Sequence, residues 1–225
     1  MITNLFSTFD PSTSINFSLN WIRTFIRFII IPSIYWIIPR RINIIFKILF
    51  NQLFNEFKTL LGKNRQGFNL IIISLFIFIL VNNIIGLLPY IFTRSRHLSY
   101  TLSLALPLWI RIILFGWINK TQEIFAHIIP NGTPPILIPF IVLIETIRNL
   151  IRPGSLAVRL TANMIAGHLL IRLLGNNISD ANTIIIPFIL IVQIILIIFE
   201  TAVSIIQAYV FSVLTTLYSR EVNYV

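Results

Sequence analysis

Long apolar runs, separated by short polar or proline-containing stretches, set the pattern of this chain. Residues 15–38 carry only Arg23 and Arg27 as charged side chains, and residues 67–93 carry none. Residues 98–119 form another apolar run, which Arg111 interrupts. Because a helix needs about 20 mainly apolar residues to cross the hydrocarbon layer, we expect a first span over 15–38 and a spanning hairpin over 67–119.

Residues 42–61 follow an amphipathic pattern instead. Six apolar residues recur at helical spacing opposite four polar ones: Ile42, Phe46, Leu49, Leu53, Phe57 and Leu60 against Lys47, Asn51, Asn55 and Lys58. A helix with one apolar and one polar face suits the boundary between lipid and water. We therefore expect a helix over 42–61 that lies on the membrane surface.

The last third of the chain predicts a long, tilted, membrane-embedded hairpin over 136–219. Residues 181–219 contain one charged side chain, Glu200, and are about twice as long as one perpendicular span requires. Either Pro187 breaks this helix early or the helix is steeply tilted. The preceding segment, 136–174, is similarly long, and the sequence GNNISD at 175–180 is the expected turn between the two. Pro153 and Gly154 are candidates for a kink.

Composition places the whole chain in lipid. Hydrophobic residues make up 56% of its 225 residues and charged ones 11%, which is typical of membrane proteins. We therefore predict an all-α integral membrane protein with a single domain over 1–225 and about six helices. The basic residues behind the net charge of +10 mostly flank apolar runs, as topology signals do, so we expect no nucleic acid as a partner.

Several chemistries have no support in the sequence. Cysteine is absent, which excludes disulfides and thiolate metal sites. The motifs of metallohydrolases, P-loops, serine hydrolases and dinucleotide sites are also missing. We expect no cofactor and no metal.

Two polar stripes mark the long hairpin. On a helical wheel, the residues of the first stripe fall within about 60° of one another: Glu145, Arg148, Arg152, Arg159 and Asn163. The residues of the second stripe also share one helical face: Gln193, Glu200, Ser204 and Gln207. The stripes either pair with each other to stabilise the bundle or enclose a hydrated path. A charge in mid-membrane costs about 2.5–3.5 kcal/mol, and this cost favours a function.

Small residues surround Arg159 on its own helical face. Ser155, Ala162 and Ala166 share that face and allow another helix to approach closely, so Arg159 is suited to a partner chain. His168 lies on the opposite side of the helix, about 13.5 Å further along, and we do not expect the two to pair. His168 is either a packing residue or a proton carrier. We expect His97 and His127 to be solvated in loops.

The segments LAVRLTANMIAGHLL and ETAVSIIQAYVFSVLTTLY together closely resemble subunit a of F-type ATP synthases in its animal mitochondrial form. The resemblance covers essentially the whole chain. It implies six helices: one span, one helix on the matrix surface and two hairpins, the last of which wraps against the ring of c subunits. It also implies a multi-pass, non-catalytic subunit of the mitochondrial inner membrane. Its partners would be the c-ring, the peripheral stalk, small membrane subunits, lipid and protons.

The resemblance also implies roles for particular residues. Arg159 matches the family's arginine that faces the ring carboxylates, with Asn163 and Gln207 at neighbouring motif positions. Glu145 falls at the position associated with the matrix-side half-channel, and His168 with Glu200 at the intermembrane-space side. Bacterial relatives carry an acid at position 168 and a histidine at position 200, so the pair is exchanged here.

Two alternatives to this function remain at the level of the sequence. An antiporter-like subunit of a respiratory complex would also use charged residues in broken helices, but the mid-membrane lysine and repeated helical unit expected of it are missing. A purely structural membrane anchor is the second alternative. It predicts that neutralising Arg159 harms assembly and leaves the proton properties of assembled complexes unchanged.

Overall fold

The computed structural model describes residues 19–21, 41–62, 66–88, 91–119, 121–122, 129, 134–180 and 184–224. Within these ranges the chain is all-helical, with no strand. The elements in chain order are η2 (Leu19–Trp21), α2 (Arg41–Leu61), α3 (Gln66–Gly86), η4 (Arg94–Arg96), α4 (Leu98–Asn119), η5 (Pro135–Leu137), α6 (Ile138–Asp180) and α7 (Ile186–Tyr224). The predicted all-α fold is confirmed. The predicted first span over 15–38 lies outside the described residues, apart from η2.

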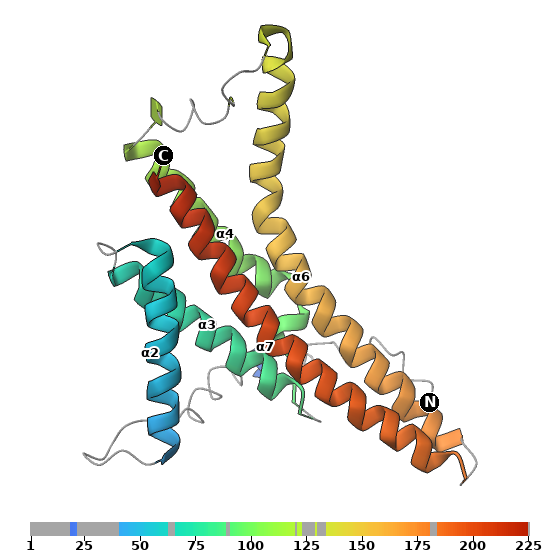
Figure 1. The fold of residues 1–225 in the computed structure, drawn as a ribbon. Coiled ribbons are helices and arrows are strands. Elements are labelled where there is room, and N and C mark those ends of the chain that lie inside the picture. Colours follow the sequence, from blue (N-terminus) through green and yellow to red (C-terminus); the bar gives the residue numbers. More distant parts are fainter. Residues whose placement is uncertain are drawn as a thin grey trace.

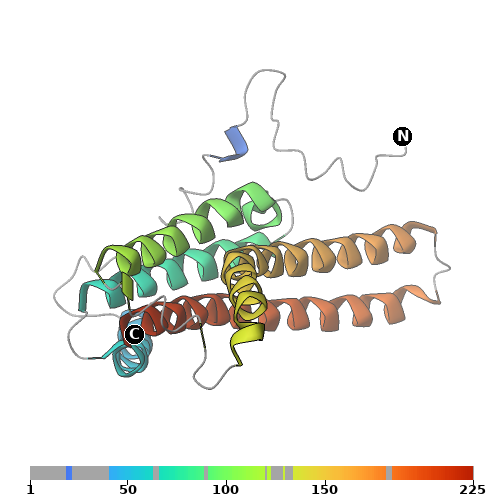
Figure 2. The ribbon, with the colours of Figure 1, turned by 90° about the horizontal axis from the view of Figure 1, so that it is seen from above.

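Within the described ranges, four helices are long and apolar enough to cross a membrane: α3, α4, α6 and α7. The amphipathic α2 is not among them. α3 packs mainly against α7, and α4 mainly against α6. The two views in Figures 1 and 2 show α6 and α7 as the longest elements, extending together beyond the other helices.

The main core lies where α3, α4, α6 and α7 meet. Its buried members are Phe76, Ile79, Ala105, Leu156, Ala157, Leu160, Ala208 and Phe211. Ala157 and Ala208 are both fully buried, and small residues of this kind let helix backbones approach closely in lipid. These two alanines therefore allow close helix packing in the core from which the polar stripes extend.

α7 is one continuous helix because Pro187 lies in its first turn, after the start at Ile186. A proline there removes an amide N–H that has no intrahelical partner in any case. Of the two alternatives for this segment, the early break by Pro187 is therefore wrong. With 39 residues, α7 is about 58 Å long and can fit a hydrocarbon layer of about 30 Å only if it is tilted.

The predicted turn at 175–180 is wrong, because α6 continues as a helix to Asp180. A single glycine costs only about 1 kcal/mol in a helix, so Gly175 is too weak a breaker to end one.

Pro153 lies buried in the interior of α6, where proline removes a backbone hydrogen bond. Figure 1 shows that α6 changes direction in its middle, and its first half rises away from α7.

Candidate functional site

Arg159 lies in the middle of α6 with its side chain exposed. Ser155, Ala162 and Ala166, the small residues on the same face, are exposed as well. Arg159 forms no ion pair or hydrogen bond with any side chain that the structure describes. Its guanidinium is therefore open to a group from outside the described chain.

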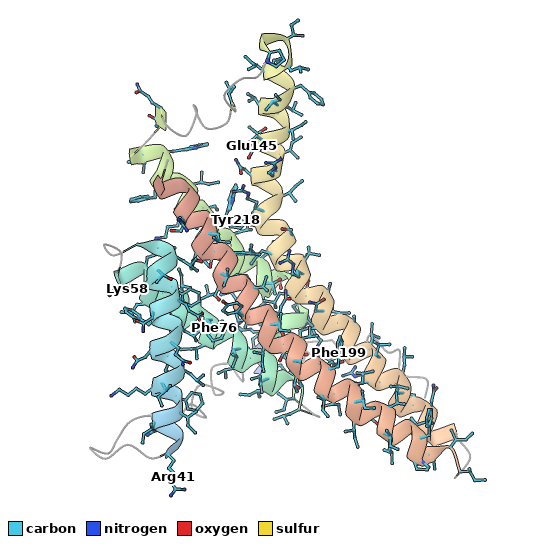
Figure 3. The ribbon with its side chains drawn as sticks, in the orientation of Figure 1. Arg41, Lys58, Phe76, Glu145, Phe199 and Tyr218 are labelled. Carbon is cyan, nitrogen blue, oxygen red and sulfur yellow. The ribbon has the colours of Figure 1, made fainter. Side chains whose placement is uncertain are left out.

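Glu145 is paired within its own stripe. The Nη1 atom of Arg148 lies 2.8 Å from Oε2 of Glu145. Figure 3 places Glu145 on the part of α6 that stands away from α7. Arg152 instead reaches α7, with its guanidinium 4.9 Å from the ring centre of Tyr218, so Glu145, Arg148 and Arg152 each have a neighbouring side chain.

The two polar stripes meet further along the hairpin. The side-chain amide of Asn163 donates a hydrogen bond of 3.1 Å to Oε1 of Gln207. Beside this contact lies a pocket of about 550 Å³, lined by polar residues of both helices and by apolar ones: Asn163, Glu200, Ser204 and Gln207, with Leu87, Leu160, Met164, Ala166, Gly167, Leu170, Leu196, Phe199 and Val203. Gln193, the fourth member of the α7 stripe, does not line it. The predicted side-by-side packing of the stripes thus holds for their central residues.

Glu200 is the buried acid of this pocket. Its side chain is 8% exposed, and neither carboxylate oxygen has a hydrogen-bond partner among the described residues. The carboxylate rests on Gly167 of α6, where a Cβ atom would lie 2.6 Å from Cδ of Glu200. Sequence reasoning missed Gly167. The only feature in the sequence that could have indicated this contact is a glycine in the interior of a helix.

His168 faces a different neighbourhood from Glu200. It does not line the pocket, and the charges of Arg96 and Arg172 lie close enough to act on it. Its Nε2 atom is buried and has no hydrogen bond within the described part of the chain. His168 directly follows Gly167, the residue on which the carboxylate of Glu200 rests, but no hydrogen bond joins His168 to Glu200.

The turn η4 packs against α3, α4 and α6 and was not singled out from the sequence. His97, expected to be solvated, is half-buried, with its ring centre 5.5 Å from that of Trp21 and 5.4 Å from that of Phe92. Burial and the charge of Arg96 lower its pKa below 6.5. The solvated interpretation of His97 is therefore wrong, because aromatic rings cover the turn. His127 lies outside the described residues.

The pocket and the exposed arginine together suit proton transfer. The carboxyl group of Glu200 can take up and release a proton, and the amides of Asn163 and Gln207 and the hydroxyl of Ser204 can hydrogen-bond to water in the same pocket. The described residues include no cluster of three or more His, Asp or Glu side chains that could hold a metal ion.

A model of the family described as ATP synthase A chain matches residues 15–220. The chain belongs to this family. It is 60% identical over 224 residues to a protein named ATP synthase subunit a in Drosophila melanogaster, with 99% of this chain and 100% of the relative covered. Proteins of the same name in Locusta migratoria and Aedes aegypti are each 59% identical, over 224 and 226 residues, with the same coverage.

Family membership and the four spanning helices define the function in outline. The chain is a subunit of ATP synthase, in the membrane part that conducts protons, and a multi-pass protein of the mitochondrial inner membrane. The antiporter-like alternative is thereby excluded.

Proposed function

We propose that this chain is the stator subunit that couples proton flow to rotation of the c-ring, with Arg159 facing the ring carboxylates. The observation that carries this proposal is an exposed arginine in the middle of an apolar span, among the exposed small residues Ser155, Ala162 and Ala166. Small residues let the helix of a partner come close. An arginine in that position supplies a fixed positive charge to whatever acid passes it.

Two offset half-channels would flank Arg159. Glu145, on the diverging half of α6, belongs to the half-channel on the matrix side. Glu200, together with Asn163, Gln207 and the nearby His168, belongs to the one on the intermembrane-space side. A proton entering through one half-channel neutralises a ring carboxylate, which then travels through lipid. Only the neutral acid crosses hydrocarbon cheaply.

Arg159 would act on the last step of each cycle. Its charge stabilises the ionised form of the carboxylate that faces it and so favours release of the proton into the second half-channel. The same charge repels protons that would otherwise pass directly between the two half-channels. Arginine suits this role because it remains charged at any physiological pH.

Energy enters through the membrane potential. Each proton gains about 2.3 kcal/mol per 100 mV, so several protons must be combined for each ATP. The chain itself catalyses no bond change in this scheme, and ATP is made on other subunits of the complex.

Vesicles carrying assembled complexes with Arg159→Ala test the proposal, with ATP synthesis and passive proton flux followed together. We expect synthesis to be lost and proton flux to change. The matched control is Arg111→Ala, because Arg111 is also an exposed arginine within an apolar span, and it should leave both unchanged. Normal synthesis by assembled Arg159→Ala complexes would make Arg159 a packing residue and the chain an anchor.

A further inference from the structure

Five basic side chains from two elements converge beside the η4 turn. Arg94, Arg96 and His97 come from the turn, and His168 and Arg172 come from α6, against which the turn packs. We call these five residues the basic cluster. Arg94 is held between aromatic rings, with its guanidinium 4.6 Å from the ring centre of Trp21 and 5.2 Å from that of Tyr100. Its position is therefore fixed.

Like charges are close together in this cluster and partly withdrawn from water. Arg96 is 6% exposed, and burial together with the charge of Arg172 lowers its pKa to about 10. Arg96 remains protonated at physiological pH and in turn lowers the pKa of His97. Concentrating positive charge at a buried position is costly, and a bound anion would lower this cost.

Neutral hydrogen-bonding groups add to the charge. Ser95 lies between the two arginines of the turn, is 1% exposed, and its hydroxyl has no hydrogen-bond partner in the described ranges. The Nε2 atoms of His97 and His168 are buried and likewise have no hydrogen bond to any described group. A hydroxyl, imidazoles and guanidiniums are the groups that bind phosphate oxygens.

The cluster lies near a membrane surface. The η4 turn joins the spans α3 and α4, and Arg172 is six residues before the end of the α6 span at Ile178, or about 9 Å along the helix. Segment 40–65 carries six basic residues and one acidic one. With α3 as a single span between α2 and η4, the cluster falls on the membrane face opposite this segment. Basic residues gather on one face for topology, so topology does not explain a second group on the other face.

We propose that the basic cluster is a binding site for a phosphate-bearing anion, either the headgroup of an anionic phospholipid or free inorganic phosphate. The planar guanidiniums of Arg96 and Arg172 can each donate two parallel hydrogen bonds to phosphate oxygens. Ser95 and the two histidines complete the set of donors. The site shares His168 with the proposed half-channel on the intermembrane-space side, but anion binding by its arginines requires no proton transfer through Glu200.

Two binding measurements on the assembled complex test this proposal and separate the sources of phosphate. In the first, delipidated complexes are placed in phosphatidylcholine vesicles with a small share of spin-labelled phosphatidylglycerol, and the motionally restricted fraction of the label is measured. In the second, binding of radioactive inorganic phosphate is measured by equilibrium dialysis in neutral detergent without phospholipid. The variants are Arg96→Gln with Arg172→Gln, and Arg111→Gln as the control.

We expect the double variant to weaken one of the two bindings about tenfold, with Arg111→Gln equal to wild type. A loss in the lipid measurement assigns the site to a headgroup, and a loss with inorganic phosphate assigns it to the free ion. Arg172→Gln alone replaces the double variant if the latter does not assemble, and Arg172→Lys, which keeps the charge, should retain most of the binding. Equal binding by variant, control and wild type in both measurements would overturn the proposal.

Discussion

At the scale of single residues, the contact between Gly167 and Glu200 is the tightest constraint on the pocket. A methyl group at position 167 would overlap the carboxylate of Glu200, and overpacking of this kind costs roughly 1–3 kcal/mol. We therefore expect Gly167→Ala to displace Glu200 and to reduce proton-driven ATP synthesis by assembled complexes about tenfold. ATP synthesis in vesicles under a fixed proton gradient measures the effect.

Gly175→Ala is the matched control for this substitution. Gly175 is in the same helix, and nothing lies within 4 Å of a Cβ atom built there, so the added methyl group should leave synthesis at the wild-type rate. Equal losses in the two variants would show that general helix effects, rather than the carboxylate, explain the result.

Lone charges in apolar runs are the residues that sequence reasoning finds. Arg159 and Glu200 stand out because ionisable groups in lipid are expensive wherever the helices lie. Gly167 and Arg96 do not stand out, since each matters only through a contact with another element. The burial of Arg96 depends on the packing of η4 against α6, which no local pattern in the sequence encodes.

At the scale of elements, apolar run length predicted the long helices well and their ends poorly. The paired long segments of 136–219 correspond to α6 and α7, but the expected turn at 175–180 is helical. Glycine and asparagine lower helix propensity only slightly, and packing readily overrides such differences. Pro187 could not be assigned in advance, because proline both begins and breaks helices.

The η4 turn should lose stability in acid because of His97. The pKa of His97 in the folded protein is below 6.5. At pH values between this folded pKa and 6.5, the unfolded chain therefore binds more protons than the folded one. The stabilisation is fully present above pH 6.5 and decreases as the pH falls through that value toward the folded pKa. Thermal unfolding of assembled complexes, followed against pH, should show a steeper loss for wild type than for His97→Gln. Parallel curves for the two proteins would contradict this assignment.

At the scale of the whole molecule, one main helix contact joins elements that are distant in the chain. α3 lies mainly on α7 and α4 mainly on α6, so the last two helices hold the earlier pair in place. Figures 1 and 2 show α7 running past α3, α4 and α6. Helix order predicts the contacts of α4 with α6 and of α6 with α7, since consecutive spans are the natural first guess for neighbours, but it does not predict the contact of α3 with α7. The crossing places Glu200 against Gly167 and leaves Arg159 exposed.

Phe57 is the most deeply buried side chain by which α2 packs against the spanning helices. Phe57 is fully buried in a cluster with Leu61 and Ile72, and Val213 of α7 packs against this cluster. Replacing such a residue by alanine costs about 3–5 kcal/mol, so Phe57→Ala should release α2 from the bundle. Hydrogen exchange of the α2 amides in assembled complexes should then become much faster.

Phe46→Ala is the control for this release. Phe46 is 40% exposed on the same helix, so its removal should leave exchange at the wild-type rate or close to it. The two variants remove the same side chain from one helix and differ in the contact with α3 and α7. If exchange in α2 is unchanged by Phe57→Ala, the helix is held by lipid or by other subunits, and the buried cluster is not its anchor. If both variants speed exchange equally, aromatic bulk along α2 matters more than its contact with the bundle.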